Sequence, residues 1–274
     1  MGLQPALFDL PPPAEPGWRP RELGAGAHLH WTTPAEVEGR LDATYYVVTR
    51  RPERLLSGLR CPLSPLEAWA DINPAGQRVP AERGYLLFDH CLYAEIRDVK
   101  ERYWAVGQSL RSIAVRDLPR KAAYRPEVGD LLLPSYASAA HKAVIVEETS
   151  QPLIVSKHFN VLHPRGRDDG LTLLALLHHR ILGEQIWALV TGTMNRALAT
   201  GGLKDLQVPD LLLESRFNLA SLVEQLLHAQ AMVVFPGRQF PLRLYWMNGT
   251  LFQWGQRARN LLQEIEQMID QSLC

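Results

Sequence analysis

The sequence has little of several features that would mark a function on their own. Lys and Arg together number 29 and so do Asp and Glu, so the zero net charge gives no sign of a polyanionic partner. The three cysteines, Cys61, Cys91 and Cys274, form no Cys-x-x-Cys pair, which indicates a reducing compartment and argues against structural zinc. No apolar run approaches the roughly 20 residues that span a bilayer, and the N-terminus lacks a secretory signal pattern. We therefore expect a cytoplasmic protein that does not enter a membrane.

Motifs for catalysis are also missing. The glycine-rich phosphate loops, His-Glu-x-x-His and Gly-x-Ser-x-Gly do not occur. Asn73-Pro74-Ala75-Gly76 lacks the second Pro and the aromatic residue of an amino-methyltransferase loop, so we interpret it as a turn. Pro209-Asp210 followed by Glu214-Ser215-Arg216 imitates a nuclease motif, but the gap is too short for two adjacent strands to bring both acids together. His28 and His30 have no further metal ligand nearby. We expect no catalysis, no metal and no cofactor.

What the sequence does have is an uneven distribution of charge. Residues 97–125 hold eight basic side chains against three acidic ones. Residues 1–40 hold three against five, and residues 205–274 hold five against seven. A basic middle can bind phosphates despite zero net charge. A solvated face neutralised by other parts of the fold explains the same pattern equally well.

The N-terminal residues read as a tail. Residues 1–27 are rich in Pro and Gly without a period, and we expect a flexible tail over residues 1–35. Within it, Gln4 to Phe8 ("QPALF") resembles the short peptides by which bacterial proteins dock on the replication sliding clamp. An apolar patch that packs on the domain is the favoured explanation of this fragment.

Residues 41–163 have mostly strand-like character. Tyr45 to Val48 have strong strand preference, and five short apolar runs between residues 84 and 163 have the length and β-branched content of strands. Ser64 to Asp71 is predicted to be a short helix followed by a turn at Asn73-Pro74. Residues 171–190 then show helical spacing, broken or kinked at Gly183.

The last third is predicted to be helical with one interruption. Asn218 is a plausible N-cap for a helix with an apolar stripe from Leu219 to Leu227. Asn248-Gly249 between "FPLRLYW" and "TLFQW" predicts a β-hairpin, and a final helix carries a stripe from Ala258 to Ile269. The fold class is therefore α+β: a β-rich domain with packed helices, followed by a C-terminal helical segment, residues 213–274, interrupted by a β-hairpin.

Several short motifs follow one another from Gly129 onward: Gly129-Asp130, Ser156 to Pro164, Gly192-Thr193, Leu203 to Leu206 and Val208-Pro209. Their order and spacing resemble the target-recognition domain of type I restriction–modification specificity subunits. That domain offers a Gly-Asp strand entry, strands that end in a turn, a helix and a small-residue loop, and a closing Leu-rich segment before a long helix. With "RLDATYY" from Arg40 to Tyr46 as its opening segment, the resemblance covers residues 36–212.

The resemblance implies a sequence-specific, double-stranded-DNA-binding subunit without catalysis of its own. A separate adenine-N6 methyltransferase subunit supplies the chemistry in that family, and a motor-nuclease subunit sometimes joins. A full specificity subunit has two recognition domains and this chain has one. It would therefore pair with itself as a homodimer, or act as one reader in a different assembly. The alternative is a non-catalytic adaptor in a DNA defence or repair complex, which recruits partners through the aromatic hairpin, residues 239–254, or the tail.

Base reading needs paired donors and acceptors on loops held by a rigid sheet, with Lys, Ser and Thr suited to phosphates. Lys157 and His158 alternate along a predicted strand, so only one of them would face DNA. The candidate DNA-binding residues are Ser135, Tyr136, Ser138, His141, Lys142, Lys157, His158, Arg165, Arg167, Thr193, Asn195 and Arg196 in the loops, with Arg120 and Lys121 from the basic middle.

The loop that contains Arg196 gives a first prediction. If Arg196 contacts DNA and not the fold, Arg196→Ala weakens duplex binding and leaves the melting temperature unchanged. Duplex titration and thermal unfolding of the same variant check both halves. A large fall in the melting temperature would show instead that the loop stabilises the fold.

Overall fold

The computed structural model describes residues 55–80, 88–99, 105–106, 110–136, 142–189, 198, 200–234 and 248–273. The chain divides into two units, Met1–Arg51 and Pro52–Cys274, and every described residue lies in the second. The predictions for the tail, for Gln4 to Phe8, for His28 and His30, and for the strand around Tyr45 lie outside the described residues. None of the helices in the described ranges is long and apolar enough to cross a membrane.

A five-stranded sheet forms the centre of the second unit. Its strands are β2 (Ala70–Ile72), β10 (Phe159–Pro164), β7 (Leu131–Pro134), β8 (Val144–Val146) and β4 (Ala105–Val106), in that order. Neighbouring strands run antiparallel except β8 and β4, which run parallel. All residues of β7 and β8 are buried, because both faces of the sheet are covered.

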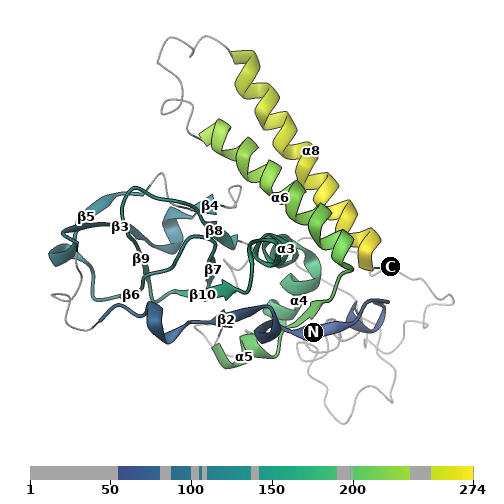
Figure 1. Ribbon diagram of the computed structural model, residues 1–274, viewed down its shortest axis with the longest axis horizontal. Coiled ribbons are helices and arrows are strands. Elements are labelled where there is room, and N and C mark those ends of the chain that lie inside the picture. The colour runs from purple at the N-terminus through teal and green to yellow at the C-terminus, as the bar shows by residue number, and fades with distance from the viewer. Residues whose placement is uncertain are drawn as a thin grey trace, which may run out of the picture. The chain divides into compact units, whose positions relative to one another are not determined.

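A four-stranded sheet lies against one face of this sheet (Figure 1). Its order is β5 (Ser112–Ala114), β3 (His90–Ala94), β9 (Leu153–Ser156) and β6 (Ala122–Tyr124), with β3 and β9 parallel. One buried cluster fills the space between the sheets; it includes Leu92, Val155, Leu132, Val144 and Val161. The β-rich character predicted for residues 84–163 is confirmed, since β3 to β10 come from this part of the chain.

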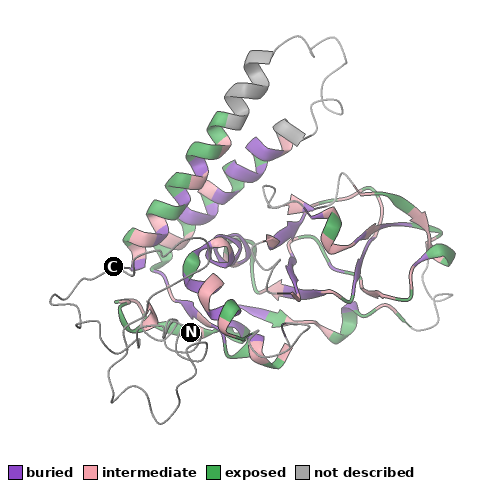
Figure 2. Ribbon diagram, turned by 180° about the vertical axis from the view of Figure 1, so that it is seen from behind, coloured by how far each residue is buried: buried purple, intermediate pink, exposed green. Residues whose placement is uncertain are grey.

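In the described residues after β10, the helices are α3 (Arg167–His178), α4 (Arg180–Leu189), α5 (Thr200–Lys204), α6 (Leu213–Val234) and α8 (Asn248–Leu273). On the other side of the five-stranded sheet, α3 packs on the strands, α4 and α6 pack on α3, and α8 packs on α6. The long helices α6 and α8 lie side by side, and α6 also packs on α3 (Figure 1). A second and larger core joins these helices to the sheet, and Figure 2 shows the buried residues concentrated in α3 and the central strands.

The apolar stripe predicted for the final helix is confirmed. Leu261, Ile265 and Ile269 of α8 are buried in the helical core, and Ala258 and Met268 are partly buried against it. Their spacing of three or four residues places them on one face of the helix, turned toward α6. The α+β fold class is confirmed as well, with a correction at the interruption of the C-terminal segment.

The predicted hairpin at Asn248-Gly249 is wrong, because α8 begins at Asn248 and continues to Leu273. Asn and Gly are also common where helices start, so the dipeptide does not distinguish the two structures. Asn218 is not a cap either, since α6 begins five residues earlier, at Leu213. The aromatic residues 240–246 lie outside the described residues, as do the side chains of Phe252 and Trp254.

The short helix predicted from Ser64 to Asp71 is wrong. The structure has β1 (Leu63–Pro65), the 3-10 turn η3 (Leu66–Ala68) and β2 in its place. Leu66 and Trp69 are buried at a spacing of three, which imitates a helix. Strand pairing sets the structure of this segment instead: β1 pairs with β11 (Gln207–Pro209), and β2 pairs with β10. Tertiary hydrogen bonds override the local pattern here.

The helical break predicted at Gly183 lies four residues earlier, at His179. His179 has an extended backbone between α3 and α4, and its Nδ1 accepts a hydrogen bond from the Ile181 backbone N–H at 3.4 Å. Its Nε2 lies 3.4 Å from Asp270 Oδ1 on α8. Burial lowers the pKa of the His179 imidazole, which keeps it neutral as this cap requires. Gly183 is simply a residue of α4.

A buried carboxylate fixes the start of β7. Asp130 is 1% exposed and follows Gly129, whose φ of +93° an L side chain rarely adopts. Its Oδ2 accepts hydrogen bonds from the Glu127 backbone N–H at 2.6 Å and from Gln77 Nε2 at 2.8 Å, and its Oδ1 lies 2.7 Å from His163 Nδ1. Burial raises the pKa of the Asp130 carboxyl, while these donors act in the opposite direction.

This arrangement predicts the effect of replacing Asp130. Asp130→Asn removes one acceptor oxygen and leaves a buried donor unsatisfied, so the free energy of unfolding should fall by about 2 kcal/mol. Urea unfolding measures it, with Asp117→Asn at an exposed carboxylate as the matched control. Equal stability of the two variants would contradict the role of Asp130.

Candidate nucleic-acid interface

Several strands of both sheets meet at one edge. The parallel strands β3 and β9 end there, since Ala94 is paired with Val155. A two-residue turn, Lys157-His158, then leads directly from β9 into β10 of the other sheet. Strand β7 ends at the same place, because Pro134 is paired with Phe159. The turn and the loops that follow β3 and β7 are therefore close together in space.

We call this place the basic edge and define it by Arg97, Arg120, Lys121, Lys157 and His158, with Ser135, Tyr136 and Lys142 beside them. The prediction that Lys157 and His158 alternate along one strand is wrong, because they form the turn between two strands. As a result the fold does not force them to opposite faces of one sheet.

Two cations of the basic edge pair with one carboxylate. Lys121 Nζ lies 2.8 Å from Glu95 Oε1, and Arg97 Nε lies 3.5 Å from Glu95 Oε2. The hydrogen bond from Lys121 is the main cause that lowers the pKa of Glu95, so Glu95 is ionised at neutral pH. Lys157 donates its backbone N–H to the Lys121 carbonyl at 2.7 Å. In the part of the chain that the structure describes, the exposed side chains of Lys157 and Arg120 have no ion-pair partner.

A polar cluster continues the edge toward β7. The Ser135 hydroxyl donates to the His158 carbonyl at 2.6 Å, and the Ser135 backbone N–H donates to the same oxygen at 2.8 Å. The Tyr136 hydroxyl lies 3.1 Å from His158 Nδ1, and the two rings are 5.5 Å apart. Ser135, Tyr136 and His158 are half-buried, so the fold holds them while part of each side chain stays accessible.

The described ends of two further loops lie at the same edge. Lys142 stands two residues before Val144, which is paired with Leu132 near the end of β7. The Leu198 backbone N–H donates to the Ser135 carbonyl at 2.6 Å. The other candidate residues of these loops, Ser138, His141, Thr193, Asn195 and Arg196, lie outside the described residues.

Two candidate residues lie elsewhere. Arg165 and Arg167 follow the far end of β10, roughly 20 Å from the turn by the rise of a six-residue strand. Arg165 Nη2 donates to the Glu67 carbonyl at 3.2 Å, and Arg167 Nη2 lies 2.8 Å from Glu224 Oε1 on α6. The structure therefore brings most of the described candidates together and separates these two from them.

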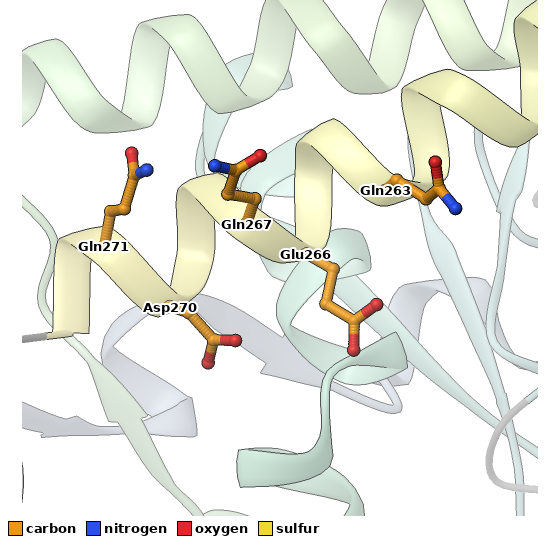
Figure 3. A pocket seen from close by; sticks show the side chains of 5 residues that line it. All are labelled: Gln263, Glu266, Gln267, Asp270 and Gln271. Carbon is orange, nitrogen blue, oxygen red and sulfur yellow. The ribbon is translucent and has the colours of Figure 1, made fainter.

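Two hollows lie away from the basic edge. One, of about 790 Å³, lies at the opposite ends of the strands and mixes Arg78 and Arg125 with Glu127 and Glu148. The other, of about 590 Å³, lies on α8 and is lined by Gln263, Glu266, Gln267, Asp270 and Gln271. Figure 3 shows Glu266 and Asp270 pointing to one side of α8 and Gln267 and Gln271 to the other. The acidic side chains of the second hollow would repel phosphate.

The described residues contain no group of three His, Cys, Asp or Glu side chains that could hold a metal ion. The charged residues that sequence reasoning left out of the candidate set are Glu95 and Arg97. Arg97 was within the basic stretch 97–125, but nothing in the sequence shows that Glu95 lies between it and Lys121. That arrangement depends on the pairing of β3 with β9 and of β9 with β6.

Comparisons with known proteins find likeness at the level of structure. No family model matches the sequence, and no curated protein sequence matches it. The solved HsdS subunit from Thermoanaerobacter tengcongensis has a TM-score of 0.50 and 15% identity, over 63% of this chain and 43% of that one. A chain from a structure of a type I R-M system, determined for its complex assembly and conformational transition, has a TM-score of 0.50 and 17% identity, over 67% of this chain and 51% of that one.

These likenesses show the fold. The chain shares the architecture of type I specificity subunits, and the resemblance expected from the sequence is confirmed at that level. The chain spans about half the length of the solved chains it matches.

Proposed function

We propose that this chain is a sequence-specific, double-stranded-DNA-binding specificity subunit of a restriction–modification system. The observation that carries the proposal is the basic edge, where cations and half-buried polar side chains from both sheets meet on a fold shared with a solved HsdS subunit. Lys and Arg contacts to phosphates supply affinity and register, and positioned polar groups supply base reading. Arg120 and Lys157 would serve the first purpose, and Tyr136, His158 and Ser135 the second.

The charge distribution around the edge supports this assignment. Glu95 is bound to Lys121 and Arg97, so it partly offsets those two cations and holds them in place. Arg120 and Lys157 have no such partner among the described residues, and their charge is available to a phosphate. Arg165 and Arg167 are proposed to play a lesser part, because both already bond within the protein.

In this proposal the reaction on DNA belongs to a separate partner, an adenine-N6 methyltransferase subunit and in some assemblies a motor-nuclease subunit. Residues 36–212 would read DNA, and residues 213–274 would serve dimerisation or partner docking. An exposed apolar surface at the start of α6 supports docking: Leu212, Leu213 and Phe217 are 79%, 68% and 54% exposed. A homodimer that reads a two-part site stays a prediction.

The same apolar surface favours a second candidate function, a protein-interaction adaptor that keeps the recognition fold without reading a base sequence. Docking of Gln4 to Phe8 on a sliding clamp would belong to either role and stays a prediction.

Duplex binding to a randomised library at two salt concentrations tests the proposed function. We expect enrichment of a defined motif, together with weaker binding at the higher salt as counterion release requires. If no motif is enriched and non-specific binding also disappears at moderate salt, the DNA-reading role is lost. If a partner protein is still retained in pull-down, that result would support the adaptor role.

The basic edge itself is tested by single charge removals. Arg120→Gln and Lys157→Gln should each lower the slope of log K against log[salt] by about 0.9, the value for one phosphate contact on B-DNA. Arg116→Gln is the matched control, because Arg116 is exposed in η7 (Val115–Asp117) at the opposite end of the four-stranded sheet. Equal slopes for all three variants would place the phosphate contacts elsewhere.

A further inference from the structure

A small hydrogen-bond network lies behind the basic edge and joins three separate elements. Asn160 is only 4% exposed and lies on β10, two residues after His158 of the turn. Asn73 follows β2, and Thr200 begins α5. Asn73 Nδ2 donates to Asn160 Oδ1 at 3.0 Å and to Thr200 Oγ1 at 3.0 Å. In Figure 1, α5 lies beside β2.

The side-chain nitrogen, the side-chain oxygen and the backbone N–H of Asn73 all form hydrogen bonds within the protein. Its Oδ1 accepts the Val161 backbone N–H at 2.8 Å, and its own backbone N–H donates to the Val161 carbonyl at 2.7 Å. Its φ is +52°, and among the described residues no other non-glycine residue has a positive φ. Asn is one of the residues that adopt this conformation most readily, and it also supplies the two amide donors.

The network continues to the turn of the basic edge. Asn160 Nδ2 donates to the Leu198 carbonyl at 3.4 Å. The Leu198 backbone N–H donates to the Ser135 carbonyl, and Ser135 donates to the His158 carbonyl. One path of hydrogen bonds therefore links Asn73 to Ser135 and His158, the polar groups assigned above to base reading.

We propose that Asn73 is a positioning residue that sets the sequence selectivity of the DNA interface, an inference that depends on the proposed function. Base reading depends on the distances and angles of a few hydrogen bonds. If Leu198 and Ser135 were held less firmly, discrimination between bases would therefore fall. Contacts of flexible Lys and Arg side chains with phosphates depend on charge and tolerate small shifts. Loss of the Asn73 amide should therefore reduce discrimination between sequences and leave the non-specific affinity in place.

Asn73→Asp is the direct test, since it keeps the size and the tolerance of positive φ but replaces both donors by an oxygen. Thr200→Val is the second variant; it removes the Thr200 hydroxyl, adds no charge and keeps the bonds of Asn73 to β10. We expect each variant to lower the ratio of specific to non-specific duplex affinity about tenfold, the order of one lost buried hydrogen bond. The slope of log K against log[salt] for random duplex should match the wild type. Asn218→Asp, at an exposed position of α6, should change neither quantity.

The outcomes separate the two proposals. If the wild-type chain selects no sequence, the proposed function fails and this inference fails with it. If the wild type selects a motif and both Asn73→Asp and Thr200→Val select it equally well, only the positioning role is overturned. An equal loss of specific and random binding in both variants, with a lower melting temperature, would give Asn73 a purely structural role and also overturn the inference. A reduced ratio with an unchanged salt slope supports it.

Discussion

The connection between the two sheets is the constraint on which the rest of the structure depends. Strands β9 and β10 belong to different sheets, yet only Lys157 and His158 separate them. The Lys157 backbone N–H bonds to Lys121 next to β6, and the His158 carbonyl accepts from Ser135 next to β7. Each half of the turn is thus fixed to its own sheet. Because so short a turn cannot span a gap, the loop ends of both sheets must meet at this place.

The core between the sheets makes this meeting rigid. Val155 of β9 and Leu132 of β7 lie in one buried cluster with Phe159 and Val161 of β10. Leu131 and Leu133 point to the opposite face and join the helical core, so β7 is buried on both sides. Protein interiors are close-packed, and a relative shift of the sheets would open cavities in both clusters. The cations of one sheet and the polar side chains of the other therefore keep a fixed spacing, as the proposed reading of a duplex would require.

The sequence predicted the elements better than their connections. The runs "LLLP" and "VIV" are short and apolar, and they form β7 and β8 as expected. "LIVSKHFNVLHP" contains no Gly, and its single Pro closes it, so no turn signal marked the passage between sheets at Lys157. Leu66 and Trp69 at helical spacing concealed two strands, β1 and β2, whose partners, β11 and β10, come much later in the chain. The Glu95 ion pairs and the Asn73 network could not be predicted, because each depends on pairing between distant segments.

The zero net charge of the chain conceals a separation of charges. In the described residues, the basic edge has Arg97, Arg120, Lys121 and Lys157, with Lys142 beside them, against Glu95 and Asp98. The acidic side chains of α8, Glu266 and Asp270, lie on a helix that packs against α6 and not against the four-stranded sheet. At an ionic strength of 0.15 M the Debye length is about 8 Å, so a phosphate at the basic edge responds mainly to the charges nearest to it. A polyanion would then be attracted to one edge and not to the chain as a whole, which limits the ways in which it can bind.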